Sequence, residues 1–395
     1  MRGVRTHAYA RDISHRHRGA ISASSFCVAL RLATIPRMAP RFVRPNVREM
    51  HGYTPGEQPA LGERVVKLNT NENPFPPSPK VIAAIQNVEP EMLRRYPSPT
   101  ADAFREAAAA LLDVKPAMIL AGNGSDDVLT IATRTFVPPG GTLAYPDPTY
   151  SLYPVLAQLE DAKTAAVPWE RDYSLPIDAL VATKADAIYM ANPNAPTGTF
   201  VSPMKVEELA KQFKGLILID EAYVDFAEDD CVPLVREYEN VIISRTMSKA
   251  YSLAGLRFVY AVGQAHVIAE MLKVKDSYNT DAISVIAATA AIQDQPYAER
   301  SWDHVRQERQ RLSSELTQMG WRVIPSQANF ILVICPSGDG KAAYLGLKQQ
   351  GILVRHFDKP GLSDKIRITV GTMQENNALL GGIKALTQAE KPVLV

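Results

Sequence analysis

The sequence predicts an α/β protein: a three-layer sandwich built on a mainly parallel sheet in a large domain, followed by a smaller α+β domain. Two observations carry this prediction. Short β-rich runs alternate with helical patterns between about residues 101 and 262, which is typical of a parallel sheet covered by helices on both faces. From about residue 295 a long helical pattern leads into a second set of strands, and 395 residues are enough for two domains.

The elements follow in order along the chain. The strands expected in the large sheet are Met118–Leu120, Thr142–Tyr145, Ala187–Met190, Leu216–Asp220, Val241–Ser244 and Phe258–Val262. The helical patterns among them include Ala101–Val114, Val128–Phe136 and Val206–Phe213. The later part is expected to contain the helix Tyr297–Met319, the strand Asn329–Ile334, the helix Lys341–Gln349 and the strand Ile366–Val370.

These elements divide the chain into parts. We expect a large domain over 75–294 and a small C-terminal domain over 295–395, which the arm 42–74 joins. The proline-rich stretch 74–79 is interpreted as the crossover between them. Residues 1–41 are expected to be a disordered extension, and the Arg- and Ser-rich composition of the first forty also resembles a transit peptide. An upstream extension before an alternative start at Met38 is favoured.

Composition excludes several classes of protein. With 46% hydrophobic and 22% charged residues and a formal net charge of +1, the chain is typical of a soluble globular protein and lacks the strong field expected of a nucleic-acid binder. No apolar stretch approaches the roughly 20 residues that cross a bilayer. The three cysteines show no CxxC spacing, so neither a disulfide framework nor a zinc site is indicated and a cytoplasmic location is expected.

Lys249 lies in the run SRTMSKAYSLAGLR (244–257), which suits a carbonyl cofactor that carries a phosphate. Thr246 and Ser248 stand three and one residues before the lysine, and Arg257 follows eight residues after it (257 − 249). The amine is a nucleophile for a carbonyl, while hydroxyls and a guanidinium bind phosphate oxygens. Because a lone lysine is usually a surface charge, the interpretation depends on the spacing of the whole run.

Two further segments place polar groups at strand ends. LILIDEAYVDF (216–226) reads as a buried strand that ends at Asp220, 29 residues before the lysine (249 − 220), and Tyr223 follows three residues later. GNGSDD (122–127) lies between a predicted strand and helix, where ligands collect in α/β proteins. The predicted phosphate donors there are the backbone amides of Gly124, Ser125 and Asp126. Considered alone, each segment could be a plain strand end or helix cap.

Together these segments resemble the cofactor-binding lysine region of the fold-type I, pyridoxal-phosphate-dependent aminotransferases. Further motifs occur in the order found in histidinol-phosphate aminotransferases, a class-II family, and the resemblance covers roughly residues 42–390. They are GYTPGEQP (52–59), NTNENPFPPSP (69–79), RYPSP (95–99), YPDPTY (145–150) and ANPNAPTG (191–198). The resemblance implies pyridoxal 5'-phosphate as cofactor, no metal, and a large domain that binds the cofactor.

The resemblance also implies roles for the matching residues. Lys249 would carry the cofactor and then act as general base, Asp220 would face the protonated pyridine nitrogen, and Tyr150 would stack on the ring. Tyr96 matches a tyrosine that reaches the cofactor phosphate of a neighbouring subunit, which implies a homodimer with composite sites. Tyr278 is a weaker candidate for a contact across that interface.

One position departs from the family pattern. The family usually has asparagine directly before Pro-Thr-Gly, where its amide donates to the cofactor's ring oxygen, but this chain has Ala195. Asn194 or Asn192 would take over this contact, or Tyr223 would hold the oxygen alone. We take Asn194 as the candidate for the contact with the ring oxygen.

The implied reaction is the transamination of L-histidinol phosphate with 2-oxoglutarate, which gives imidazole acetol phosphate and L-glutamate in histidine biosynthesis. Arg367 in KIRITVGT and Arg355 in GILVRHF match the family's substrate-binding arginines. Tyr53 and Asn73 of the arm are expected to close the pocket.

Several alternatives stay open at this point. An aromatic amino-acid aminotransferase or a threonine-phosphate decarboxylase would have a similar scaffold. From another class, a non-catalytic regulatory module could retain the fold, although Lys249, Asp220 and Arg257 argue against it. A nicotinamide dehydrogenase is disfavoured because GNGSDD lacks the GxGxxG spacing.

Overall fold

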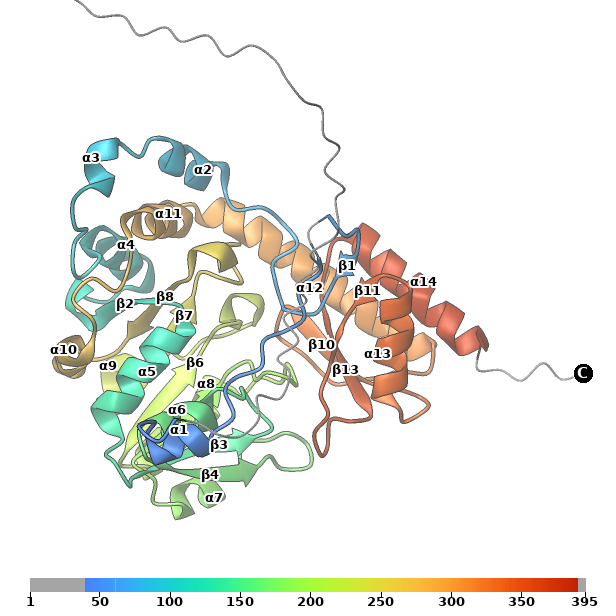
Figure 1. The fold of residues 1–395 in the computed structure, drawn as a ribbon, viewed down its shortest axis with the longest axis horizontal. Coiled ribbons are helices and arrows are strands. Elements are labelled where there is room, and N and C mark those ends of the chain that lie inside the picture. The colour runs from blue at the N-terminus through green and yellow to red at the C-terminus, as the bar shows by residue number, and fades with distance from the viewer. Residues whose placement is uncertain (1–39, 61, 390–395) are drawn as a thin grey trace, which may run out of the picture. The chain divides into compact units, whose positions relative to one another are not determined.

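The computed structural model describes residues 40–60 and 62–389. Its large sheet has the strand order β2-β8-β7-β6-β5-β3-β4 (Figure 1). All neighbouring pairs from β4 to β7 are parallel, whereas β8 is antiparallel to both β7 and β2. The strands are β2 (Ile119–Asn123), β3 (Thr142–Asp147), β4 (Lys163–Pro168), β5 (Ala187–Ala191), β6 (Leu216–Asp220), β7 (Val241–Thr246) and β8 (Phe258–Val262). The predicted mainly parallel sheet is confirmed.

Successive residues of the central strands enter two different cores. In β6, Ile217 and Ile219 belong to one apolar cluster, and Leu216 and Leu218 belong to the other. The first cluster includes residues of α2 (Pro79–Gln86), α4 (Asp102–Leu112), α7 (Ile177–Ala182), α8 (Pro203–Gln212), α11 (Ala282–Ile292) and α12 (Gln295–Gln318). The second includes residues of α5 (Ser125–Phe136), α6 (Tyr153–Leu159) and α10 (Ala265–Val274). Helices therefore cover both faces, which explains why these strands are continuous apolar runs.

A separate antiparallel sheet of order β12-β13-β10-β9 forms in the C-terminal part. Its elements are β9 (Arg322–Val323), β10 (Phe330–Ile334), β12 (Arg355–His356) and β13 (Lys365–Thr369), with helices α13 (Gly340–Gln349) and α14 (Met373–Ala389). In the arm, β1 (Val66–Lys67) pairs in parallel with β11 (Ile352–Leu353). This pairing agrees with an arm that joins the small domain, and the division into domains itself remains a prediction.

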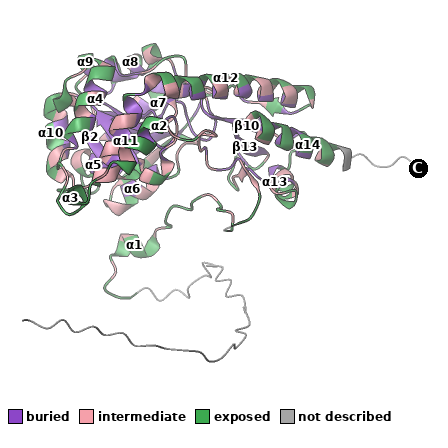
Figure 2. Ribbon diagram, turned by 90° about the horizontal axis from the view of Figure 1, so that it is seen from above, coloured by how far each residue is buried: buried purple, intermediate pink, exposed green. Residues whose placement is uncertain are grey.

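Some boundaries differ from the sequence prediction. Helix α5 begins at Ser125, three residues before the predicted start, because its first turn is polar and carries no apolar periodicity. The remaining short helices are α1 (Pro45–Glu49), α3 (Pro90–Leu93) and α9 (Leu234–Glu237), with 3₁₀ turns at Pro116–Met118, Val224–Phe226 and Ala254–Leu256. Neither α1 nor α3 contains a buried residue (Figure 2).

Most of the predicted extension 1–41 lies outside the described residues. Within residues 40–60 and 62–389, no helix combines the length and the apolarity needed to cross a bilayer.

Candidate active site

The predicted cofactor residues come from loops at one edge of the large sheet. Strands β2 to β7 share one direction and β8 runs the opposite way, so the carboxyl ends of six strands lie at the edge of the sheet where β8 begins. In α/β proteins, ligands bind at this edge. The residues found there are Gly124, Ser125, Asp126, Tyr150, Asn194, Asp220, Tyr223, Thr246, Ser248, Lys249 and Arg257.

Arg257 lies against the start of α5 and forms one wall of a polar cup. Its Nη1 donates to Ser248 Oγ at 3.4 Å, and the Ser248 amide donates to Thr246 Oγ1 at 3.1 Å. A Cβ atom on Gly124 would lie 2.5 Å from Arg257 Nη2, and the φ of Gly124 is +82°. The positive φ favours glycine at this position, and a Cβ atom there would push the Arg257 guanidinium out of its place in the cup. A guanidinium, two hydroxyls and a helix start in one place form a site for an anion such as phosphate.

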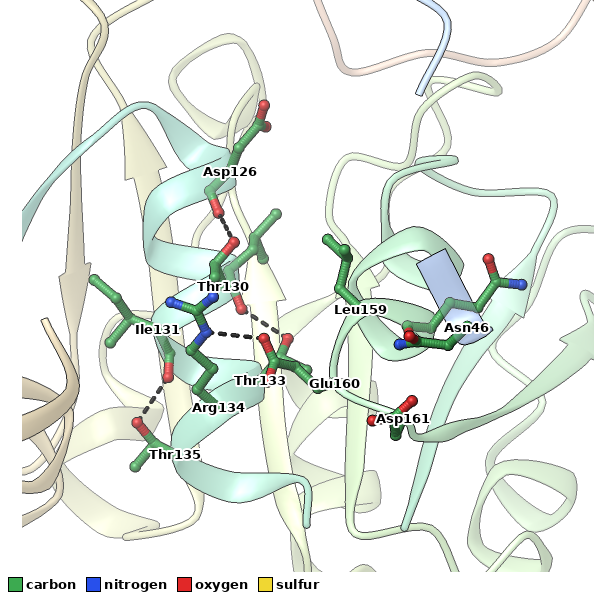
Figure 3. Close-up of polar contacts among 12 residues, drawn as sticks. Asn46, Asp126, Thr130, Ile131, Thr133, Arg134, Thr135, Leu159, Glu160 and Asp161 are labelled. Atoms are coloured by element: carbon green, nitrogen blue, oxygen red, sulfur yellow. Dashed lines mark hydrogen bonds and ion pairs between the residues drawn. The ribbon is translucent and has the colours of Figure 1, made fainter. Parts of the chain in front are cut away.

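The first turn of helix α5 has no side-chain cap. Thr130 Oγ1 donates to the Asp126 carbonyl at 2.6 Å, and Arg134 Nε donates to Glu160 Oε1 at 2.8 Å. Both contacts are drawn in Figure 3. At the start of the helix, Asp126 Oδ1 accepts from the Tyr150 hydroxyl at 3.3 Å. The amides of this turn are therefore left without a side-chain acceptor, and the positive end of the helix dipole favours a negative group there.

Asp220 presents a buried carboxylate at the end of β6. Its Oδ2 accepts from the Tyr153 hydroxyl at 3.3 Å, and its Oδ1 is buried with no hydrogen-bond partner among the described residues. Burial raises the pKa of Asp220 from 3.8 to about 6, although the bond from Tyr153 opposes the rise. A bare buried carboxylate oxygen is costly unless a donor or cation meets it. Sequence reasoning missed Tyr153, whose apolar helical surroundings are typical of a core tyrosine.

Lys249 places its amine beside the arm. Its Nζ donates to the Thr70 carbonyl at 2.9 Å. Burial and the positive charge of Arg367 lower the pKa of Lys249 from 10.5 to about 8, while Glu72 acts in the opposite direction. A lysine amine with its ordinary pKa is almost wholly protonated at neutral pH. The structure therefore gives Lys249 a much larger fraction of nucleophilic neutral amine.

This pKa gives a prediction for the cofactor-free protein. Acylation of Lys249 by an amine-reactive reagent, followed by peptide mass spectrometry across a pH series, should show a rate midpoint near pH 8. The exposed Lys273, labelled in the same samples, provides the internal reference. A Lys249 profile with its midpoint near 10.5 would contradict the lowered pKa.

Two arginines of the small sheet face one another beside this site. The register of β12 and β13 pairs Arg355 directly with Arg367. Arg367 Nη2 donates to the Asn69 carbonyl at 3.0 Å, and its Nε is buried without a hydrogen-bond partner in the described chain. Arg355 donates to the carbonyls of Pro55 and Thr54, at 3.3 and 3.4 Å. Like charges directly opposite across strands destabilise a sheet, so this pair is suited to an anion between them.

The remaining predicted residues take other positions. Tyr53 of the arm meets the Tyr150 ring edge-on, with 5.8 Å between centroids. Asn73 donates to the Ala250 carbonyl at 3.2 Å and thereby holds the segment after Lys249. Tyr96 is 81% exposed and its ring stacks on that of Tyr278, with 4.4 Å between the centroids. The roles assigned to Tyr53, Asn73 and Tyr96 stay predictions.

Asn194, the candidate for the cofactor contact that Ala195 cannot make, is completely buried in its loop. Its Nδ2 donates to the Pro148 carbonyl at 3.0 Å and to Thr197 Oγ1 at 2.8 Å, and its Oδ1 accepts from Thr149. Both amide hydrogens are thus engaged within the loop. A contact between Asn194 and a cofactor remains a prediction.

Comparison with known proteins fits this geometry. Residues 63–383 match the model of the family described as aminotransferase class I and II. The histidinol-phosphate aminotransferase 1 of Trichormus variabilis is 45% identical over 345 residues, which is 87% of this chain and 99% of that protein. The chain belongs to the class I and II aminotransferases and, within them, to the histidinol-phosphate aminotransferases.

Two more relatives of this aminotransferase agree. The histidinol-phosphate aminotransferase of Rhodopirellula baltica is 43% identical over 88% of this chain and 96% of its own length. The crystal structure of histidinol-phosphate aminotransferase from Sinorhizobium meliloti in complex with pyridoxal-5'-phosphate superposes with a TM-score of 0.82. It is 26% identical and covers 90% of this aminotransferase and 100% of that chain.

Proposed function

We propose that this aminotransferase uses pyridoxal 5'-phosphate to transfer the amino group of L-histidinol phosphate to 2-oxoglutarate, in histidine biosynthesis. The products would be imidazole acetol phosphate and L-glutamate. The observation that carries the substrate assignment is the direct pairing of Arg355 with Arg367 near the Lys249 amine. Two guanidinium groups at one point suit a phosphate, which has more negative charge and more acceptor oxygens than a carboxylate.

The residues present fit the proposed cofactor. The uncapped start of α5, with Gly124, Ser125 and Asp126, would hold its phosphate together with Thr246, Ser248 and Arg257. Asp220 would hold the protonated ring nitrogen, which supplies the partner that its buried Oδ1 lacks within the described chain. Tyr150 would lie on the ring face, and Tyr223 would donate to the ring oxygen. When bound, the cofactor supplies a reactive aldehyde and an electron-withdrawing ring.

The side chains of the protein divide the remaining work. Arg355 and Arg367 hold the substrate's phosphate and so fix the distance of its amino group from Lys249. The Lys249 amine, with its lowered pKa, takes the proton from the substrate's α carbon. The negative charge of Asp220 would favour the protonated form of a ring nitrogen held against it.

An amino-donor panel tests the proposed function. Purified protein is supplied with the cofactor, 2-oxoglutarate and one donor at a time: histidinol phosphate, phenylalanine or threonine phosphate. Glutamate formation should be fastest, by a wide margin, with histidinol phosphate. Preference for phenylalanine would indicate an aromatic aminotransferase, and release of carbon dioxide from threonine phosphate would indicate a decarboxylase. Either result would contradict the proposal.

Replacing Arg367 with glutamine is expected to weaken use of the phosphate-bearing donor. Removing one partner of a desolvated charge pair should cost about 3 kcal/mol, so kcat/KM for histidinol phosphate should fall roughly 10²-fold. Phenylalanine should lose less, because its carboxylate has less negative charge and fewer acceptor oxygens than a phosphate. The matched control is Arg322→Gln, since Arg322 is exposed on the same sheet. Equal losses for both donors would show that Arg367 does not favour a phosphate over a carboxylate.

We further propose a homodimer. Tyr96 and Tyr278 form an exposed stacked pair, and a second subunit would give Tyr96 the phosphate contact expected from the family resemblance. Sedimentation should therefore give twice the chain mass. A cytoplasmic location is proposed, with an organelle as the alternative if residues 1–40 are a transit peptide. Those residues lie almost entirely outside the described chain.

A further inference from the structure

Asn71 of the arm is bonded through every polar group it has. Its Nδ2 donates to the Tyr223 hydroxyl at 3.0 Å, and its Oδ1 accepts from Thr369 Oγ1 at 3.2 Å. Its amide donates to the same Thr369 oxygen at 3.0 Å, and its carbonyl accepts from Asn329 Nδ2 at 2.9 Å. Because Thr369 ends β13 while Tyr223 follows β6, one side chain joins the two sheets.

The backbone of Asn71 also marks it as unusual. The residue is 1% exposed and has φ of +57°, in the left-handed region that residues other than glycine seldom adopt. Asparagine tolerates this conformation better than most residues, and surrounding bonds are needed to hold it there. The four hydrogen bonds of Asn71 supply that restraint.

The bond to Tyr223 has a fixed polarity. An amide Nδ2 can only donate, so the phenol oxygen of Tyr223 accepts and its own proton is left to point elsewhere. The preceding residue, Thr70, accepts from the Lys249 amine at 2.9 Å, so two consecutive arm residues hold two groups of the site. Ala195, which belongs to the small apolar cluster that packs against Tyr223, has no side-chain donor for this region.

We propose that Asn71 is a positioning residue that directs the Tyr223 proton toward the ring oxygen of the cofactor and links this orientation to the docking of the small sheet. The inference rests on the proposed function in one respect, namely that Tyr223 faces the cofactor. Burial raises the pKa of Tyr223, and the bond from Asn71 opposes that rise. Asn71 thereby strengthens Tyr223 as a donor, which offsets the missing asparagine at Ala195.

Two substitutions separate the effect of the hydrogen-bond direction from the effect of the backbone conformation at residue 71. Asn71→Asp keeps the size of the side chain and tolerates positive φ. Its carboxylate, however, accepts a hydrogen bond from the Tyr223 hydroxyl instead of donating one to it. Asn71→Gly keeps the backbone conformation and removes the side chain. Each is made alone and with Tyr223→Phe, so that double-mutant cycles isolate effects that pass through the hydroxyl. The control is Asn240→Asp, because Asn240 precedes β7 at the opposite edge of the sheet and donates to the Phe213 and Gly215 carbonyls.

The first readout is the pH midpoint of the visible absorbance of cofactor-loaded protein. A hydrogen bond to the anionic ring oxygen stabilises the deprotonated form, so its loss in Asn71→Asp should raise the midpoint by about one pH unit. Asn240→Asp should not move it. In the Tyr223→Phe background neither Asn71 variant should add a further shift. An unchanged midpoint in Asn71→Asp, or an equal shift without the Tyr223 hydroxyl, would overturn the inference.

The second readout needs no cofactor. Thermal unfolding of the four cofactor-free proteins in the Asn71→Gly and Tyr223→Phe cycle should reveal coupling, with the double variant less destabilised than the sum of the single variants. Strictly additive losses would mean that Asn71 does not act through the hydroxyl, and the inference would fall. Protein that shows this coupling but never acquires visible absorbance would refute the proposed function and not the link between Asn71 and Tyr223.

Discussion

Alanine at position 249 is expected to lower kcat by about 10⁴-fold, because the substitution removes both the nucleophilic amine and the group proposed to move the α proton. The lowered pKa of Lys249 increases the fraction of neutral, nucleophilic amine at neutral pH. Arginine at this position should lose as much activity, since it keeps the charge but cannot lose its proton at neutral pH. Glutamate production from histidinol phosphate and 2-oxoglutarate provides the measurement.

The control for this substitution is Lys273→Ala, which removes an exposed lysine paired with Glu270 three residues away. Its activity should equal that of the natural protein. Circular dichroism should show that Lys249→Ala remains folded, because the lysine is not part of an apolar cluster. Substantial transamination by folded Lys249→Ala would contradict its proposed role.

Asparagine in place of Asp220 is expected to lower activity while stabilising the cofactor-free protein. Burial raises the pKa of Asp220 to about 6, so the folded state binds a proton more readily than the unfolded chain. Stability is therefore lost as pH rises from 3.8 to about 6, and the full penalty remains above that range. At pH 8 the neutral amide should remove up to about 3 kcal/mol of this penalty, and at pH 4 little should change.

The activity of Asp220→Asn should fall at least about 10²-fold, because an uncharged amide would not stabilise a protonated ring nitrogen at neutral pH. Denaturant unfolding at pH 4 and pH 8 measures the change in stability. Asp178→Asn, on the exposed face of α7, is the control and should alter stability by less than about 0.5 kcal/mol. If Asp220→Asn were less stable than the natural protein at pH 8, the claim that the buried Asp220 carboxylate destabilises the cofactor-free protein would be wrong.

The large sheet and its site edge could be predicted because parallel strands buried on both faces are continuous apolar runs. β6 is such a run, and its end at Asp220 was visible in the sequence. The direction of β8 was not, because periodicity carries no information about the sense of a strand. Tyr153, Asn71 and Thr70 were also missed as partners of Asp220, Tyr223 and Lys249, since these contacts join residues between 67 and 179 positions apart.

The structure also adds to what the sequence indicated about the predicted residues. Arg355 and Arg367 were expected from two separate motifs, and only the register of β12 and β13 shows that they are direct neighbours. The lowered pKa of Lys249 arises from burial and from Arg367, far along the chain. Charges assembled by folding in this way have no local sequence pattern.

Borohydride reduction of protein incubated with pyridoxal 5'-phosphate, followed by peptide mapping, tests the central claim most directly. Reduction makes a carbonyl–amine linkage permanent, so the labelled side chain can be identified by mass spectrometry. We predict one pyridoxyl group per chain, on Lys249, and none on that peptide in Lys249→Ala. Label on a different lysine, or no label at saturating cofactor, would contradict the role of Lys249.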